Sequence, residues 1–210
     1  MVQYFSDVFC PIANWSVCMN KKMNKIFNEA KRNWYKEKYT KSFHLYLKCA
    51  NKGHIPCYDE LAYMYHDGIG TCTNLTKALY WYKKAEKAGV HCHLNIADIY
   101  TKSQYKNVDK EKYWLKKGIE RKDSSSMYNM AIFYRQQNKM KKMKKWFIKS
   151  YKANDGSAAF ELAKFYLSKG KIKKGIKYLK ITINHPHKTL YEQEKSELYL
   201  ARIKKFKKYT

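Results

Sequence analysis

Apolar side chains recur along this chain with the spacing of α-helices. In clusters such as residues 61–65 and 146–151, they fall at positions i, i+3 and i+4, which places them on one face of a helix. A half-buried strand would instead alternate apolar and polar residues. The pattern therefore predicts an all-α protein.

Two kinds of apolar cluster alternate along the chain with a common period. The first kind contains an alanine at 62, 97, 131 and 163, and these alanines lie 35, 34 and 32 residues apart. The second kind is centred on Trp81, Trp114, Trp146 and Tyr178, which lie 33, 32 and 32 residues apart. Two interleaved signals with one period indicate a repeat of two helices, here called helix A and helix B.

The two clusters suit close antiparallel packing. A small alanine in helix A lets the backbones approach, while the large ring in helix B fills the space beside it. The expected A helices span residues 22–34, 57–67, 92–102, 125–137 and 157–168. The expected B helices span residues 37–52, 74–88, 109–121, 139–153 and 171–183, and a last helix spans 190–207.

The best-defined repeat, residues 57–89, resembles the Sel1-like repeat, a relative of the tetratricopeptide repeat with a longer loop between its helices. The residues that carry the resemblance are Leu61-Ala62-Tyr63-Met64-Tyr65, Gly68, Gly70, Asn74, Lys77-Ala78, Trp81-Tyr82, Lys84-Ala85 and Gly89. The later repeats lack the glycine pair, and connections such as Gln137-Asn138 are short. The resemblance implies an α/α superhelix of a kind that usually acts as an adaptor or scaffold for protein complexes, and it does not imply a catalytic site.

The expected architecture is an α/α superhelical solenoid of about five helix pairs over residues 22–184. Because a stack leaves an apolar face open at its end, residues 188–210 are expected to form a basic capping helix. Its apolar stripe is Tyr199, Leu200, Ile203 and Phe206. Residues 1–21 are either an N-terminal cap or a lead, and the pattern leaves both open.

The leading functional hypothesis is a non-enzymatic scaffold whose A helices line a groove for a protein or peptide. The helix A residues that the packing pattern leaves free are Tyr63, His66, Asp98, Arg135 and Lys164. No nucleophile lies in a strained glycine turn and no phosphate-binding glycine loop is present, so no catalytic residue and no cofactor are expected.

Charge supports an alternative partner. The chain of 210 residues has a formal net charge of +27, and a positive field of this size attracts polyanions. A lysine-rich ridge at the starts of the last two B helices could follow a nucleic-acid backbone; it comprises Lys139, Lys141, Lys142, Lys144, Lys145, Lys169, Lys171, Lys173 and Lys174. However, only four of the 44 basic residues are arginine, the side chain that gives bidentate phosphate contacts.

The six cysteines are interpreted as free thiols, because no leader directs the chain to an oxidising compartment. Cys49, His54 and Cys57, with Cys72 as a conceivable fourth ligand, have the best metal-binding spacing. Structural zinc usually uses two close ligand pairs, and a second pair is not evident. These cysteines are therefore interpreted as small buried residues, and no metal is expected.

No stretch of eighteen apolar residues occurs in the sequence, so no membrane span is expected. The absence of a basic leader before an apolar segment predicts an intracellular protein, in the cytoplasm, or in that of a host cell if the gene is viral. The sequence leaves the oligomeric state open.

Overall fold

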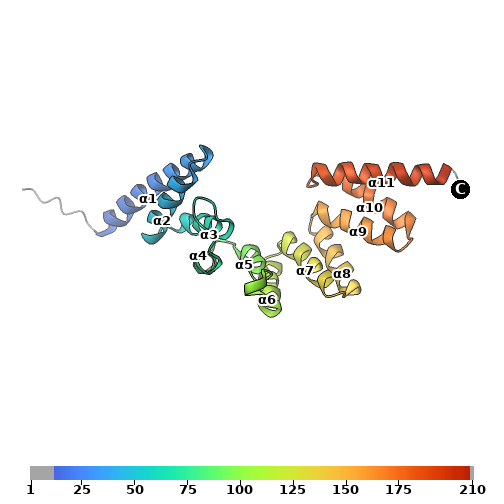
Figure 1. Cartoon of the computed structure of the whole chain (residues 1–210), viewed down its shortest axis with the longest axis horizontal. Coiled ribbons are helices and arrows are strands. Elements are labelled where there is room, and N and C mark those ends of the chain that lie inside the picture. Colours follow the sequence, from blue (N-terminus) through green and yellow to red (C-terminus); the bar gives the residue numbers. More distant parts are fainter. Residues whose placement is uncertain (1–11, 209–210) are drawn as a thin grey trace, which may run out of the picture. The chain divides into compact units, whose positions relative to one another are not determined.

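The computed structural model describes the backbone of residues 12–208 and the side chains of residues 21–205. Within this range the chain is all-α and contains no strand (Figure 1). The helices are α1 Ile12–Tyr35, α2 Tyr39–Asn51, α3 Tyr58–Asp67, α4 Leu75–Lys87, α5 His93–Ile99, α6 Val108–Glu120, α7 Ser124–Gln136, α8 Met140–Lys152, α9 Gly156–Ser168, α10 Ile172–Asn184 and α11 Leu190–Lys208, with short 3-10 turns at Ile55–Cys57 and Ser103–Tyr105. The expected all-α class is confirmed.

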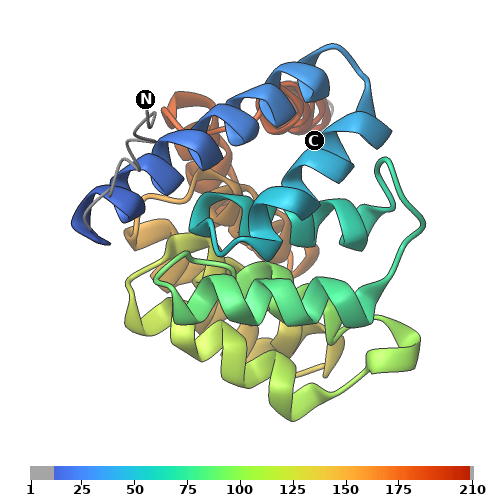
Figure 2. The same ribbon diagram turned by 90° about the vertical axis from the view of Figure 1, so that its left-hand side faces the viewer.

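The chain divides into two compact units. Unit 1 is Met1–Ile99 and contains α1 to α5, whereas unit 2 is Tyr100–Thr210 and contains α6 to α11. The A helices are α1, α3 and α5 in unit 1 and α7 and α9 in unit 2. The B helices are α2 and α4 in unit 1 and α6, α8 and α10 in unit 2. Helices that are neighbours in sequence lie beside each other within each unit (Figures 1 and 2).

Most helix boundaries lie within two residues of those expected, and two helices differ more. α1 begins at Ile12, so residues 12–21, expected as a lead or cap, have a helical backbone; residues 1–11 lie outside the described range. α5 ends at Ile99, earlier than expected, because the carbonyl of Tyr100 accepts a hydrogen bond from the N–H of Asn107 at 3.0 Å and the intervening residues form a loop.

One backbone hydrogen bond recurs at every turn from helix A to helix B. The N–H at the N-cap of the B helix donates to the carbonyl of the residue three places after the repeat alanine. The pairs are Lys38–Asn33 at 2.9 Å, Asn74–Tyr65 at 2.7 Å, Asn107–Tyr100 at 3.0 Å, Lys139–Tyr134 at 2.9 Å and Lys171–Tyr166 at 2.9 Å. Each turn is therefore closed in the same way, although the loops differ in length.

The repeat core consists of the predicted alanines and one large residue from each B helix. Ala62, Ala131 and Ala163 are fully buried. The B-helix residues at the centre of the core are Tyr46, Tyr82, Leu115, Phe147 and Leu179, each at most 2% exposed. From the second repeat onwards each of these directly follows the aromatic expected from the sequence. Trp81 and Trp114 are buried as well, whereas Trp146 and Tyr178 are half-buried.

The tryptophans of the B helices also contact lysine side chains. In three B helices, a lysine one turn later lies over the tryptophan ring as a cation–π pair. Lys84 lies 4.7 Å from the ring centre of Trp81, Lys117 lies 4.7 Å from that of Trp114, and Lys149 lies 4.4 Å from that of Trp146. Part of the high lysine content therefore covers apolar surface of the repeats.

In unit 2, α11 covers the last repeat. Leu200 and Ile203 pack against a core cluster of Phe160, Ala163 and Leu179, and the ring of Tyr199 lies 6.4 Å from that of Phe160. The expected capping helix is thus present, while the side chain of Phe206 lies outside the described residues. None of the described helices combines the length and apolar character that a membrane span requires.

The loop between α3 and α4 requires glycine at position 70. Gly70 has a φ of +69°, a conformation that residues with a Cβ adopt only at a cost. A Cβ there would also overlap the backbone of Tyr39 and Thr40 at the start of α2. The glycine pair that distinguishes this repeat therefore holds the loop against the preceding B helix.

We expect Gly70→Ala to lower the free energy of unfolding by about 2–4 kcal/mol, since it combines backbone strain with a steric overlap that cannot relax easily. Gly89→Ala is the matched control, because Gly89 has a φ of +89° but has no atom within 4 Å of a built Cβ. It should cost only about 1 kcal/mol. Urea unfolding followed by circular dichroism measures both, and equal losses would contradict the proposed overlap.

Candidate functional site

The best-formed cleft beside the predicted groove residues lies in unit 2 between α7, α8 and α9. It has a volume of about 280 Å³. Its floor is apolar and includes the buried side chains of Met143 and Phe147. Arg135 of α7 and Lys164 of α9 line its mouth. Two of the five predicted partner-binding residues are therefore brought together at one cleft.

A single carboxylate organises the charges of this cleft. Glu161 accepts a hydrogen bond from Nη1 of Arg135 at 2.9 Å, and its other oxygen lies 2.5 Å from Nζ of Lys164. The Glu161 side chain is 13% exposed, whereas those of Arg135 and Lys164 are 45% and 38% exposed. Two cations share one carboxylate, so the cleft mouth has a net positive charge available to an acidic partner.

A second cleft lies in unit 1 between α1, α2 and α3. It has a volume of about 180 Å³ and is lined by Lys31, Trp34, Tyr35, Tyr46, Glu60 and Tyr63. The ring centres of Trp34 and Tyr63 lie 6.0 Å apart. A hydrogen bond to Asp67 raises the pKa of the Tyr63 hydroxyl. Burial, and then the charge of Asp59, raise the pKa of Glu60, while Lys31 opposes this change.

The remaining two predicted groove residues bind each other in unit 1. Nε2 of His66 lies 3.2 Å from Oδ2 of Asp98, and the His66 side chain is only 12% exposed. Its ring also lies 6.1 Å from that of Tyr82. Neither residue lines the clefts described above. Their pairing joins the A helices α3 and α5.

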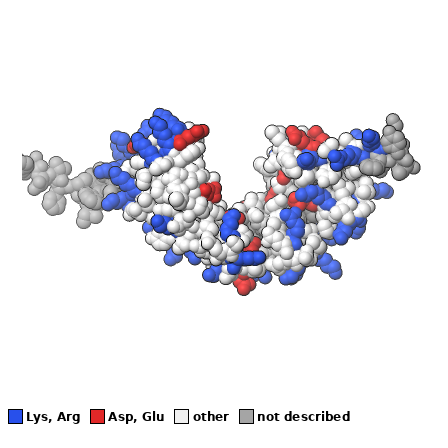
Figure 3. All heavy atoms as spheres, in the orientation of Figure 1, with Lys and Arg blue, Asp and Glu red and all other residues white. Residues whose placement is uncertain are grey.

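The predicted lysine ridge lies at the N-termini of two B helices in unit 2. Lys139 and Lys171 are the N-cap residues of α8 and α10, and neither makes a side-chain capping bond. All nine ridge lysines are exposed except Lys144, which is half-buried. Basic side chains are numerous on the surfaces of both units (Figure 3). Because a helix N-terminus is itself electropositive, these lysines add to a positive field.

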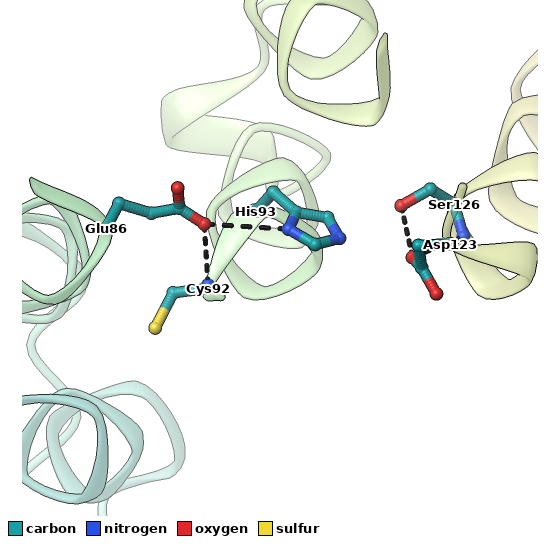
Figure 4. A network of polar contacts seen from close by, with 5 residues as sticks. All are labelled: Glu86, Cys92, His93, Asp123 and Ser126. Atoms are coloured by element: carbon teal, nitrogen blue, oxygen red, sulfur yellow. Dashed lines mark hydrogen bonds and ion pairs between the residues drawn. The ribbon is translucent and has the colours of Figure 1, made fainter. Parts of the chain in front are cut away.

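The A helices of unit 2 begin in the opposite manner, with acidic caps. Asp123 accepts hydrogen bonds from the N–H groups of Ser125 and Ser126, and Asp155 accepts them from the first turn of α9. Unit 1 has a related contact, where Oε1 of Glu86 accepts from the N–H of Cys92 at 2.7 Å and lies 3.5 Å from Nδ1 of His93 (Figure 4). Carboxylates therefore accept hydrogen bonds from N–H groups at the starts of these helices, which have no acceptor within the helix.

Unit 2 also contains a polar hollow that was not predicted from the sequence. It has a volume of about 620 Å³ and lies beside the N-termini of α7 and α9. Its lining includes Ser124, Asn129, Asp155 and His187. Residues this distant in sequence meet only because the loop after α10 returns to Gly156, where an added Cβ would overlap His187. No motif in the sequence marks it.

Three of the candidate metal ligands meet in unit 1. Cys49 and Cys57 form a disulfide, with their Cα atoms 6.2 Å apart, so the interpretation of all six cysteines as free thiols is wrong for this pair. His54 lies beside them, and the ligand atoms of all three residues lie within 4.8 Å of one another. Among the described residues, Cys72 and Cys92 are free thiols, and Cys72 does not belong to this cluster.

His54 is unusual in this cluster because Nε2 is buried without a hydrogen-bond partner. The residue is 9% exposed, and burial lowers the pKa of its imidazole. An unsatisfied buried polar atom costs about 1–3 kcal/mol. The fold therefore leaves an imidazole nitrogen available beside two sulfur atoms.

Solved structures with a similar fold are Sel1-repeat proteins. A protective antigen of uropathogenic Escherichia coli that displays an SLR fold matches with a TM-score of 0.57 and 21% identity, over 68% of this chain and 33% of the antigen. A Sel1 repeat protein from Oxalobacter formigenes matches with a TM-score of 0.55 and 22% identity, over 70% of this chain and 63% of that protein. No protein-family model and no curated protein matches the chain.

The chain has the Sel1-like repeat fold. The resemblance first noted over residues 57–89 is thereby confirmed at the level of fold, as is the expected class of antiparallel helix pairs with a capping helix. The chain spans about one third of the E. coli antigen and less than two thirds of the Oxalobacter protein. Activity and partners of those proteins are not transferred by this likeness.

We expect Cys72 and Cys92, the two free thiols among the described side chains, to differ strongly in reactivity. Burial, and then the charges of Asp59 and Glu86, raise the pKa of Cys92 to about 12, so its thiolate fraction at pH 8 is on the order of 10⁻⁴. Cys72 is exposed. Alkylation of the native chain at pH 8, read by peptide mass spectrometry, should modify Cys72 and leave Cys92 intact until urea is added. Equal rates in the native chain would contradict the burial of Cys92.

Proposed function

We propose that this chain is a scaffold that binds a segment of another protein through clefts beside its A helices. The observation that carries the proposal is the unit 2 cleft, where Arg135, Glu161 and Lys164 surround an apolar floor. Protein interfaces favour such an arrangement, with an apolar centre and charged residues at its rim. The Sel1-like repeat fold supports the same reading, because it exposes rows of helices to a partner.

The size and charge of the clefts favour one kind of peptide segment as the partner. Volumes of about 280 Å³ and 180 Å³ suit one or two inserted side chains rather than a whole cofactor. An apolar side chain can contact Met143 and Phe147 on the floor, while a neighbouring carboxylate can replace Glu161 as a partner of Arg135 or Lys164. We therefore propose a peptide in which an acidic residue lies beside an apolar anchor.

A nucleic-acid partner is the second candidate, supported by the lysine ridge. Among the described residues, none of the nine ridge lysines forms an ion pair with a carboxylate. They lie at the N-termini of α8 and α10, which adds the positive end of each helix dipole to their charge. Binding through such lysines would be independent of base sequence and would weaken steeply with salt.

A capture experiment with variants distinguishes the two candidates. The full chain is used to capture partners from extract with and without nuclease, at about 150 mM salt, where charges are screened to physiological extent. Discrete proteins that persist after nuclease treatment are expected. Recovery of nucleic acid alone, or loss of all captured material with nuclease, would instead favour the lysine ridge.

Substitution of the cleft residues should weaken the captured complex. We expect Arg135→Ala together with Lys164→Ala to reduce affinity by about tenfold or more, because each removes a charged partner at the interface rim. Lys177→Ala is the matched control, since Lys177 is an exposed lysine of unit 2 outside the cleft. Titration calorimetry with the captured partner measures both. Equal affinities for the double variant and the control would contradict the cleft as the binding site.

A further inference from the structure

The junction between α2 and α3 contains two cysteines and a histidine, Cys49, Cys57 and His54, whose chemical groups the packing of the repeats does not require. Cys49 lies three residues after the buried core residue Tyr46 of its B helix, and the equivalent residues of the later repeats are Ala85, Gly118, Ser150 and Thr182, all buried. Cys57 lies five residues before Ala62, and its equivalents are Cys92, Ser126 and Ala158, also buried. These positions need only a small side chain. Cysteine occupies both of them at this junction alone among the described repeats.

His54 occupies a repeat position that is an aspartate in two later repeats. Counted from the repeat alanine, His54 corresponds to Asp123 and Asp155 in unit 2, which accept backbone hydrogen bonds at the starts of α7 and α9. The side chain of His54 makes no such capping bond, and its buried Nε2 has no hydrogen-bond partner. The helix-cap position is thus occupied by an imidazole, whose Nε2 has no hydrogen-bond partner and can serve as a metal ligand.

We propose that Cys49, His54 and Cys57 form a zinc site in the reduced chain, and that the disulfide is the metal-free, oxidised state of the same cluster. Two sulfur atoms and one imidazole nitrogen within 4.8 Å of one another match the ligands that zinc prefers, with bond lengths of about 2.0–2.3 Å. A small separation of the sulfur atoms after reduction brings all three within reach of one ion. The fourth position is left to water, as in other three-ligand zinc sites.

Charge favours zinc over a monovalent soft cation. Cys49 and Cys57 are fully buried, and a buried site is most stable when its charges cancel. Two thiolates and one Zn²⁺ with a neutral imidazole have no net charge, whereas two thiolates and a monovalent ion leave one negative charge. The cluster lies directly beneath exposed residues, because residues 51–53, at the end of α2 and in the turn before His54, are all exposed.

The two states interconvert by a balanced reaction. A dithiol reductant supplies two electrons and two protons, the bond between the two sulfur atoms breaks, and the reductant itself becomes a disulfide. Zinc then displaces the protons of both thiols, so binding releases two protons and weakens as the pH falls. Oxidation by a disulfide of the medium reverses the sequence, reforms the Cys49–Cys57 bond and expels the metal.

The first test compares reduced and oxidised forms of the full chain. Each form is dialysed against Zn²⁺ without oxygen, and bound zinc is counted by atomic emission. One zinc per reduced chain is expected above the level bound by a Cys49→Ser and Cys57→Ser double variant, and none above that level in the oxidised chain. Co²⁺ in place of zinc should give thiolate-to-metal charge-transfer absorption in the reduced chain only. Equal zinc in both forms, or no excess over the double variant, would overturn the proposal.

The second test uses His54→Gln, which retains both cysteines. This variant should form the disulfide as the parent does, shown by mass spectrometry after alkylation, so its fold can be verified independently of metal. Its affinity for zinc should fall by more than about tenfold, since loss of even an outer partner of a ligand has an effect of that size. Cys72→Ser and His91→Gln are matched controls outside the cluster and should bind as the parent does. Undiminished affinity in His54→Gln would sink the proposal.

Discussion

The architecture depends on the backbone hydrogen bond that closes each turn from helix A to helix B. It joins the same two repeat positions at 2.7–3.0 Å in all five turns, whether four, six or eight residues lie between its partners. The bond fixes where helix B begins after the last turn of helix A, and in the last repeat Leu179 of helix B lies in the same core cluster as the repeat alanine, Ala163. The loop length therefore varies while the closing bond stays the same: the long loop with Gly70 and the three-residue turns before α8 and α10 all contain it.

The helix pairs could be predicted from the sequence because the apolar periodicity is spread over the whole buried face of each helix. A single exceptional residue does not remove that pattern. In the B helices the most deeply buried residue is the one after the expected tryptophan, as in the adjacent pairs Trp81-Tyr82 and Trp146-Phe147. Period alone does not say which of two large neighbours is the more deeply buried. The tryptophan rings are in turn covered by Lys84 and Lys149.

The candidate site was predictable only in part, since its essential contacts join residues far apart in the sequence. Arg135 and Lys164 could be selected as free positions on A helices, but Glu161, which organises them, was hidden within an apolar cluster. The metal spacing of Cys49, His54 and Cys57 was visible, yet only the fold reveals that the three ligand atoms meet. The sequence does not show a second close ligand pair, whereas in the fold the turn between α2 and α3 brings the three ligand atoms together.

A repeat fold separates the positions that define the stack from those that can acquire chemistry. The backbone bonds at the turns and the alanines define the stack, and they make no use of side-chain reactivity. Packing requires only a small residue at the position of Cys49 and only a helix cap at the position of His54. A reactive side chain can therefore occupy either position without disturbing the neighbouring repeats. At the junction between α2 and α3, reactive side chains occupy both kinds of position. That coincidence is the physical reason to regard this cluster as functional, rather than as a small-residue core contact.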